Sequence, residues 1–280
     1  MDILSETEMV LTESDFRRVS KVIFDHCGIN LTDGKKTLVR ARLAKRIRRS
    51  TCRTFKEYID YVLSPEGQKE FYTFVDSLST NLTSFFRENN HFEYLRRKFL
   101  PDLIAKQERS SKLRVWSAGC SSGEEPYSLA ITLLECFQNT PGWNIKILAT
   151  DVSTQILKIA QAGTYDKQRV EPLSAQQKHR FLVPNNIEGQ KVYQVAGNLR
   201  NIIRFRYLNL MDKWPFSGPF DCIFCRNVMI YFDKPTQEKL INRFWDCLAK
   251  NGVLCIGHSE SLSGIKHKYR YVEPATYVKV

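Results

Sequence analysis

The sequence has no run of 18 apolar residues, although 42% of its 280 residues are hydrophobic. A helix that crosses a bilayer needs about 20 such residues, so no membrane-spanning segment is predicted. The first ten residues contain three acids and no base, which is not the pattern of a secretory signal. Internal repeats and low-complexity segments are also absent. These absences predict a soluble globular chain of one large or two small domains.

Metal-binding signatures are equally scarce. The five histidines form no HxxxH or HxH pair, which argues against zinc. Cys222 and Cys225 have CxxC spacing, but they lie in an apolar, strand-like run with no second pair nearby. The eight cysteines are scattered, and most lie in apolar stretches. Without an export signal, we expect reduced thiols, a cytoplasmic protein and no bound metal.

Positive charge is concentrated in one short segment. The formal net charge is +12, and the fifteen residues from Lys35 to Arg49 contain eight bases and no acid. In a helix, Val39, Leu43 and Ile47 form an apolar stripe that can dock the segment on its domain. We expect this helix to bind an anionic partner, which charge alone leaves open between nucleic acid, an acidic protein surface and lipid headgroups. The bases expected to contact it are Arg40, Arg42, Lys45, Arg46 and Arg49.

The spacing of apolar residues changes along the chain. Helical spacing dominates at first, which predicts a small all-α domain over residues 1–85 with the basic helix at about 35–49. Short apolar runs then alternate with helical patterns, which favours an α/β domain with a mostly parallel sheet over residues 86–280. The predicted strands span 113–118, 145–150, 220–225 and 252–257. A hairpin between residues 191 and 207 is expected within an inserted β subdomain at about 183–207.

A turn with two glycines follows the first predicted strand. Gly119 and Gly123 permit positive φ and close backbone approach just before a helix begins. Glu124 and Glu125 stand where a pyrophosphate would lie in a dinucleotide site, so the turn favours an ammonium or sulfonium group instead. Asp151 ends the next strand and is placed to accept hydrogen bonds from ribose hydroxyls. A positively charged nucleoside without phosphate, S-adenosylmethionine, fits this pattern.

The same turn also matches the G-x-S-x-G nucleophile elbow of hydrolases. Ser121, Asp221 and His258 follow the chain order of a hydrolase triad. However, no oxyanion segment of the HGGG type precedes the turn. A hydrolase would also leave Asp151 and the acidic turn without a role. We therefore favour the adenosylmethionine interpretation.

Several longer segments carry a more specific signal. Through them the chain resembles the CheR family, the chemoreceptor glutamate O-methyltransferases that use S-adenosylmethionine. The resemblance covers nearly the whole chain, with the segments in family order, and implies a Rossmann-like, seven-stranded methyltransferase sheet after the helical domain. The matching segments are Thr80–Arg87, Gly123–Ser128, Ala149–Asp151, Phe224–Asp233 and Gly257–Glu260.

The resemblance also implies roles for individual residues. Tyr231 would lie beside the transferred methyl group, and Arg87 would position the carboxylate of the substrate or of the cofactor. Glu125 would hold the methionine end of the cofactor, and Asp151 would bind its ribose. The remaining cofactor contacts would come from Asn81, Thr83, Arg87, Asn209, Leu210, Arg226 and Asn227, with S-adenosylhomocysteine as the product.

The family's substrate is the cytoplasmic domain of a methyl-accepting chemotaxis protein, and the basic helix would look onto its methylation region. Some members also dock a pentapeptide tail of the receptor on a glycine-rich turn of the inserted hairpin. Here Val183–Gly189 has one glycine and looks shortened, so we expect recognition without the tail. We expect a monomer that neither binds nucleic acid nor inserts into a membrane.

An adenosylmethionine-binding chain of this kind has two alternative functions. Nucleic-acid methyltransferases that modify amino groups commonly carry an Asn/Asp-Pro-Pro-aromatic segment after the fourth strand, whereas Arg226–Tyr231 has no proline. A non-catalytic module that senses adenosylmethionine is the other alternative. Methylation of a glutamate needs no general base, because the carboxylate is already ionised at pH 7 with a pKa of about 4.3. The lack of an obvious catalytic histidine dyad is therefore expected.

Overall fold

We describe residues 10–106, 112–187 and 189–280 from a computed structural model of the chain. The chain forms two compact units. A helical unit ends at Thr80 and also includes the short segments Ser153–Gln155 and Tyr231–Asp233. A larger α/β unit begins at Asn81 and contains the other described residues.

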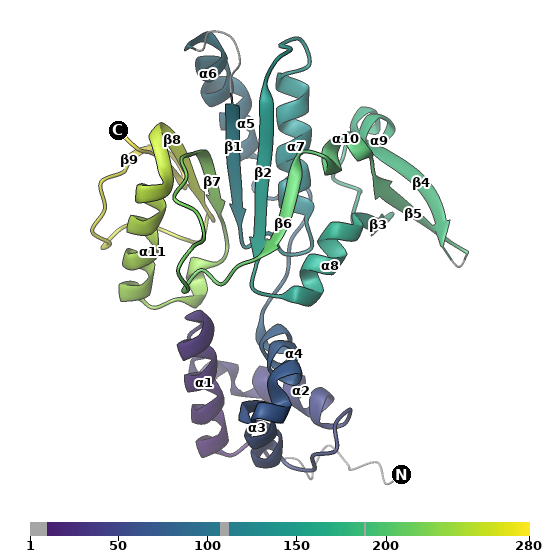
Figure 1. The fold of residues 1–280 in the computed structure, drawn as a ribbon, viewed down its shortest axis with the longest axis vertical. Helices are drawn as coiled ribbons and strands as arrows, with labels where there is room; N and C mark the ends of the chain where they lie inside the picture. Colours follow the sequence, from purple (N-terminus) through teal and green to yellow (C-terminus); the bar gives the residue numbers. More distant parts are fainter. Residues whose placement is uncertain (1–9, 107–111, 188) are drawn as a thin grey trace. The chain divides into compact units, whose positions relative to one another are not determined.

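In the described residues of the helical unit, four α-helices are present (Figure 1). Thr12 caps the first helix through a capping box with Asp15, and Gly28 ends it in a left-handed conformation (φ 75°). The predicted apolar stripe of the basic helix is confirmed, since Val39 and Leu43 are fully buried. The helices are α1 (Glu13–Cys27), α2 (Lys36–Ile47), α3 (Phe55–Leu63) and α4 (Gln68–Leu78), with 3-10 turns at Asp33–Lys35 and Pro65–Gly67.

A seven-stranded sheet is the centre of the α/β unit (Figure 1). The strand order is β6-β2-β1-β7-β8-β10-β9, and the first five strands in this order run parallel. The predicted mostly parallel sheet and all-α N-terminal domain are therefore confirmed. The strands are β1 (Lys112–Ala118), β2 (Asn144–Asp151), β6 (Ile203–Tyr207), β7 (Phe220–Cys225), β8 (Leu248–Ile256), β9 (Arg270–Glu273) and β10 (Thr276–Val278).

Helices of the α/β unit precede, connect and cover these strands. They are α5 (Asn90–Tyr94), a π turn at Leu95–Phe99, α6 (Leu100–Lys106), α7 (Glu124–Cys136), α8 (Thr154–Ala162), α9 (Ala175–Phe181), α10 (Gly197–Arg200) and α11 (Lys234–Cys247). Among the helices described, none combines the length and the apolar character that a bilayer crossing requires.

A second, three-stranded antiparallel sheet projects from the α/β unit (Figure 1). It consists of β3 (Thr164–Asp166), β4 (Leu182–Ile187) and β5 (Gln190–Val195) in the order β3-β5-β4. The prediction that residues 203–207 belong to this hairpin is wrong, because they form β6 and pair in parallel with β2. Alternation marks a strand with one buried face but does not identify the neighbouring strand. Here that face, Ile203 and Phe205, packs into the main core.

The carboxyl ends of the parallel strands meet at one edge of the main sheet. β1, β2, β6, β7 and β8 end there, and the residues that follow each strand form neighbouring loops. Ligands of open α/β sheets bind in the crevice at this edge.

Candidate functional site

The turn between β1 and α7 is fixed by its own backbone. Gly119 and Gly123 have positive φ (89° and 98°), and so does Ser121 (48°). The N–H groups of Gly119 and Cys120 donate to the Thr150 carbonyl at 2.8 and 2.9 Å, which ties the turn to the end of β2. A Cβ on Gly119 would lie 2.5 Å from the Val228 side chain, so glycine is required here for space as well as for conformation.

Asp151 connects the loops after three strands. Its Oδ2 accepts a 2.8 Å hydrogen bond from the Ser121 N–H, and its carbonyl accepts one from the Leu208 N–H at 3.0 Å. Asn209 and Leu210 follow directly and are buried. Three of the residues assigned to cofactor binding, Asp151, Asn209 and Leu210, therefore come together at the sheet edge.

The two glutamates at the start of α7 have different environments. Glu124 accepts from the Ser122 hydroxyl at 2.7 Å and forms an ion pair with Arg169. Glu125 accepts from the Ser117 hydroxyl at 2.7 Å and pairs with Arg226. Burial raises the pKa of Glu125 although Arg226 opposes this shift. Glu124 therefore fixes the turn, whereas Glu125 belongs to a larger polar network.

Arg226 is the centre of that network. Its Nη1 donates to Glu125 at 3.1 Å, and its Nη2 donates to Glu88 at 3.0 Å and to the Arg87 carbonyl. Asn227 Nδ2 donates to the other oxygen of Glu88 at 3.2 Å. Burial opposes ionisation of Glu88, but Arg226 and Asn227 outweigh it and lower its pKa. Two carboxylates thus share one guanidinium, which leaves a net negative charge near the loops after β1 and β7.

The segment Asn81–Arg87 is anchored on α7. Phe85 is buried, with its ring centroid 5.1 Å from that of Tyr165, and the Phe86 N–H donates to the Ser128 hydroxyl at 2.9 Å. At its start, the Asn81 carbonyl accepts from the Ser121 hydroxyl at 2.9 Å. The segment therefore lies beside the β1–α7 turn.

The structure places three further predicted site residues only in part. Thr83 is half-buried. Arg87 Nη1 donates to the Leu82 carbonyl at 2.7 Å, so the side chain folds back on its own segment. Tyr231 ends the 3-10 turn Met229–Tyr231, and its carbonyl accepts from the Asn30 N–H at 2.7 Å within the helical unit. The proposed roles of Tyr231 and Arg87 in positioning the reacting groups stay predictions.

The basic side chains of the segment Lys35–Arg49 fall into two sets, those bonded within the helical unit and those exposed to solvent. Arg42 donates to the carbonyls of Leu78 and Ser79 at 3.0 and 2.9 Å. Arg46 forms a two-pronged ion pair with Glu70 at 2.8 Å. This geometry favours a structural role for both arginines, which helical spacing could not reveal because their partners lie more than twenty residues away. The exposed bases among those predicted to bind the partner are Arg40, Lys45 and Arg49.

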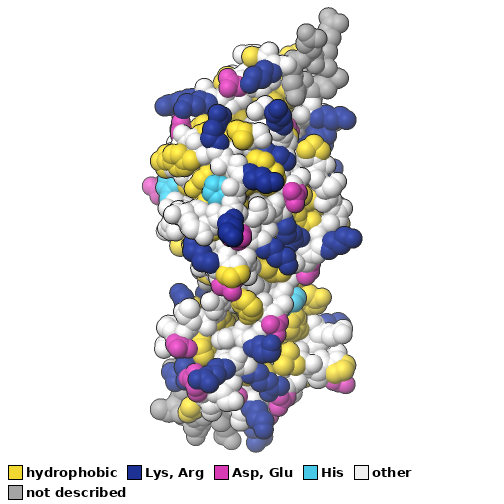
Figure 2. Space-filling view, turned by 90° about the vertical axis from the view of Figure 1, so that its left-hand side faces the viewer, with side chains coloured by type: hydrophobic (Ala, Val, Ile, Leu, Met, Phe, Trp, Pro, Cys, Tyr) yellow, Lys and Arg dark blue, Asp and Glu magenta, His cyan; other side chains and the backbone are white. Residues whose placement is uncertain are grey.

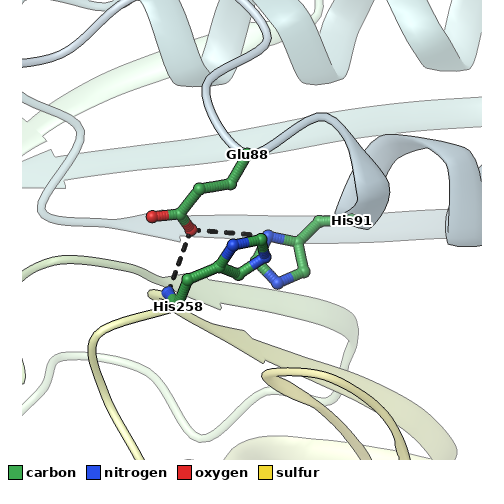
Figure 3. Close-up of side chains that lie close together, drawn as sticks. All are labelled: Glu88, His91 and His258. Carbon is green, nitrogen blue, oxygen red and sulfur yellow. Dashed lines mark hydrogen bonds and ion pairs between the residues drawn. The ribbon is translucent and has the colours of Figure 1, made fainter.

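Glu88, His91 and His258 lie close together (Figure 3), with one potential ligand atom of each within 4.8 Å of the others. His91 is fully buried, neither ring nitrogen has a hydrogen-bond partner, and its Nδ1 lies 3.9 Å from Glu88. Two histidines and a carboxylate can hold zinc. Here, however, the oxygens of Glu88 already accept from Arg226 and Asn227, and the guanidinium would repel the ion.

The protonation state of His91 follows from the same surroundings. Burial, with the positive charge of Arg226, lowers the pKa of His91 to about 3. The ring is therefore neutral at physiological pH and packs against Phe224 at a centroid distance of 6.1 Å. The arrangement favours a neutral packing histidine over a metal ligand.

The hydrolase alternative is incompatible with the fold. Asp221 lies at the start of β7 and accepts from the Arg114 N–H at 2.8 Å, whereas Ser121 follows the opposite end of the parallel strand β1. Asp221 is level with Arg114, and the four strand residues from there to Ala118 span roughly 13 Å before the turn that carries Ser121 begins. No triad with Asp221 can form. Cys222 and Cys225 are also unsuited to a shared site, because residues three apart in a strand point to opposite faces.

Three residues of the network lie outside the site residues predicted from sequence: Glu88, Arg169 and Glu260. One structural signal marks the region, since Phe86, Glu88, Ser121 and Asn227 have positive φ although they are not glycine. Such conformations cluster at functional sites. Sequence spacing does not reveal them, because φ depends on the surrounding contacts.

A mostly parallel α/β sheet with the carboxylates of Glu88, Glu125 and Asp151 near its carboxyl edge is typical of a domain that binds a nucleoside cofactor. Two family models match the chain: CheR methyltransferase, all-alpha domain, over residues 14–79, and CheR methyltransferase, SAM binding domain, over residues 81–278.

Full-length relatives agree with these matches. The chain is 43% identical to a probable chemotaxis protein methyltransferase of Rhizobium etli, over 91% of this chain and 96% of the relative. It is 42% identical to a chemotaxis protein methyltransferase of Borreliella burgdorferi (96% and 95%) and 38% identical to one of Escherichia coli (95% and 91%). The chain belongs to the CheR methyltransferase family, and the resemblance read from the sequence is confirmed.

Proposed function

We propose that the protein is a protein-glutamate O-methyltransferase that uses S-adenosylmethionine to esterify glutamates of chemoreceptor cytoplasmic domains. The observation that carries this proposal is the match to both family domains in order, at 81–278 and 14–79, with full-length relatives described as chemotaxis protein methyltransferases. A module that retained only cofactor binding would not need the all-α domain.

The charges of the crevice suit the cofactor. Glu125 and Glu88 share the single guanidinium of Arg226, and Asp151 adds a third carboxylate at the end of β2. An excess of carboxylate favours the ammonium and sulfonium groups of adenosylmethionine and disfavours phosphate. We assign Glu125 to the methionine end, Asp151 to the ribose, and Asn209 with Leu210 to the adenine. Asn81, Thr83, Arg226 and Asn227 line the rest of the pocket.

When bound, S-adenosylmethionine supplies a methyl group whose carbon bonds to a substrate carboxylate oxygen while its bond to sulfur breaks and the electron pair stays on sulfur, which leaves S-adenosylhomocysteine. The chain's own task is alignment, which can contribute about 7–11 kcal/mol in favourable cases. We assign this task to Arg87 and Tyr231. A substrate glutamate is already ionised at neutral pH, so the chain need not supply a base.

The substrate surface we propose is acidic. Arg40 and Lys45 on α2, and Arg49 two residues after its end, are exposed to solvent and suit the glutamate-bearing helices of a receptor. The protein would act in the cytoplasm as a monomer. β4 and β5 pair as far as Ile187 and Gln190, which supports receptor recognition without a tail peptide.

The decisive experiment supplies a methyl-labelled donor and a receptor cytoplasmic fragment to the full-length protein. We expect label on the receptor that is released as methanol in mild base, because carboxyl methyl esters hydrolyse under these conditions. A receptor fragment with its methylated glutamates changed to alanine is the control. Base-stable label, or label on RNA, would contradict the proposal.

The same experiment separates the alternatives. Saturable cofactor binding without any transfer would indicate a sensing module. Nucleic-acid methylation is disfavoured by the lack of prolines after β7. On the face shown in Figure 2, the described lysine and arginine side chains are interspersed with acidic and apolar ones. A nucleic-acid site would present them as a patch or stripe.

A further inference from the structure

Glu260 holds two loops at the functional edge of the sheet. Its Oε2 accepts hydrogen bonds from the N–H groups of Asn227, at 3.1 Å, and Gly257. Its Oε1 accepts from the N–H of Ile230 at 3.2 Å. Among the described residues, no lysine or arginine forms an ion pair with this carboxylate. The group is therefore compensated by backbone donors alone.

Burying the Glu260 carboxylate without an ion-pair partner costs free energy, which its hydrogen bonds must offset. Burial raises the pKa of Glu260, while the backbone N–H groups that it binds act in the opposite direction. Hydrogen bonds to an ionised acceptor are roughly twice as strong as neutral ones. The carboxylate thus clamps the backbone that it touches more firmly than a neutral side chain could.

The clamped backbone is the loop after β7. In this loop Asn227 has a left-handed conformation (φ 58°), and its side chain donates to Glu88. The preceding residue, Arg226, joins Glu88 to Glu125. Because a side chain follows its own backbone, the clamp fixes where Arg226 and Asn227 point. Tyr231 comes directly after the last clamped residue, Ile230.

The second loop held by Glu260 follows β8 and begins at Gly257, where there is no space for a larger side chain. A Cβ on Gly257 would lie 2.6 Å from Asn227 Nδ2, 2.8 Å from Asn227 N and 2.9 Å from Glu260 Oε2. Only glycine allows the end of β8 to approach the loop after β7 this closely. Gly257 and Glu260 therefore act together on one neighbour.

We propose that Glu260 is a positioning residue for methyl transfer, which acts by holding the Asn227–Ile230 turn so that Arg226, Asn227 and Tyr231 keep their working geometry. This inference rests on the proposed function. It assigns Glu260 no contact with the cofactor or the substrate.

The test is steady-state methylation by Glu260→Gln in the full-length protein. The amide keeps the shape but replaces one acceptor oxygen with an NH2 group that would face a backbone N–H. We expect kcat to fall by about 10- to 100-fold, since small misplacements of aligning groups have effects of this size. The KM for adenosylmethionine should change by less than about threefold, because Glu125 and Asp151 lie on other loops.

Two variants and one control sharpen the test. Gly257→Ala should reproduce the loss of kcat, because it pushes on the same turn from the other side. Glu260→Asp should recover part of the rate, because it restores the charge with a shorter reach. Glu238→Gln is the control, since Glu238 also accepts a backbone hydrogen bond, but from the Lys266 N–H at 3.0 Å, and its kcat should match the wild type.

Other outcomes are distinguishable. If the wild type methylates the receptor and Glu260→Gln matches its kcat, the positioning role is wrong and the proposed function stands. A drop in melting temperature that accounts for the whole rate loss would also overturn the role. If the wild type transfers no methyl group, the proposed function itself fails.

Discussion

The basic helix α2 and the acidic edge of the sheet use charge in opposite ways. On α2 and just after it, Arg40, Lys45 and Arg49 are exposed to water. At the sheet edge, Glu125 and Arg226 are largely buried and bonded to each other. Exposed charges gain little energy from any one contact and act over a distance that salt shortens. Buried charges are expensive to separate and hold a fixed geometry.

This contrast shows why partner binding and catalysis need different arrangements of charge. A surface that must meet another protein needs accessible charge, and α2 retains it although Arg42 and Arg46 are committed to the helical unit. A pocket that must align a reaction needs groups that cannot move, and the network around Arg226 provides them. The predictions below test the contrast from its largest effect to its smallest.

The largest effect is expected for Arg226→Gln. The change leaves Glu88 and Glu125 without their shared cation, and breaking a buried pair in this way costs about 3–5 kcal/mol. We expect the free energy of unfolding to fall by this amount, with loss of cofactor binding. Urea unfolding and calorimetric titration with adenosylmethionine measure the two effects. The exposed Arg204→Gln should change neither, and a stability loss below about 1 kcal/mol in Arg226→Gln would contradict the buried network.

A smaller effect on stability but a large one on rate is expected for Arg87→Ala. The Arg87 side chain is half-exposed and donates to the Leu82 carbonyl of its own segment, so its removal should leave the melting temperature nearly unchanged. Methylation should fall by about 100-fold if Arg87 aligns a carboxylate. Initial rates with a receptor fragment provide the measurement, with the exposed Arg97→Ala as the control. Near-normal turnover would remove Arg87 from the catalytic positions.

An intermediate effect is expected in acid. The pKa of His91 is lowered to about 3 in the folded protein, below its usual value of 6.5. The stability that this histidine contributes is therefore complete above pH 6.5 and is lost as the pH falls towards 3, by about 1.4 kcal/mol per pH unit. Urea unfolding at pH 7 and pH 5 should show a loss of about 2 kcal/mol from this group. That loss should be absent in His91→Gln and unchanged in His179→Gln, and equal slopes in all three proteins would rule out His91 as its source.

The smallest effects are expected for Arg46 and Arg49, two arginines of the basic segment Lys35–Arg49. Arg46→Gln breaks the ion pair with Glu70, which also accepts from the Tyr58 hydroxyl at 2.6 Å, and should lower stability by about 1–3 kcal/mol. Arg49→Gln should leave stability within about 0.5 kcal/mol but weaken receptor binding.

Thermal unfolding and receptor binding at two salt concentrations distinguish these arginines. Raised salt should weaken receptor binding much more than cofactor binding, because only the first depends on exposed charge. If Arg46→Gln and Arg49→Gln changed stability equally, the division of α2 into two sets would be wrong.

Much of the architecture could be predicted because local patterns carried it. The apolar stripe of α2, the stop at Gly28 and the strands that end at Asp151 and Cys225 depend on residues close in sequence. The assignment of 203–207 to a hairpin failed for a related reason. Alternating burial defines a strand, whereas the strand beside it is decided by long-range packing.

The candidate site shows the same division. The acids at 124, 125 and 151 were identified from their places after predicted strands, because parallel strands bring such positions to one edge. Glu88, Arg169 and Glu260 were not identified, because each acquires its meaning from a partner more than thirty residues away. Glu260 ends the matching segment Gly257–Glu260 but received no role, and nothing in the spacing of Glu88 and Arg169 distinguishes them from surface charges.

By itself, the sequence determined the class of protein: a helical domain with one basic helix, followed by an α/β domain whose first strands end in a glycine turn and acidic residues. Local periodicity, caps and turn residues suffice for this, because they act between neighbours along the chain. The tertiary structure was needed to show which basic side chains are available to a partner and which form ion pairs within the protein. Arg46 and Arg49 look alike in the sequence, yet one meets Glu70 and the other meets water, because the free energy of a charge depends on its distance from other charges and from solvent.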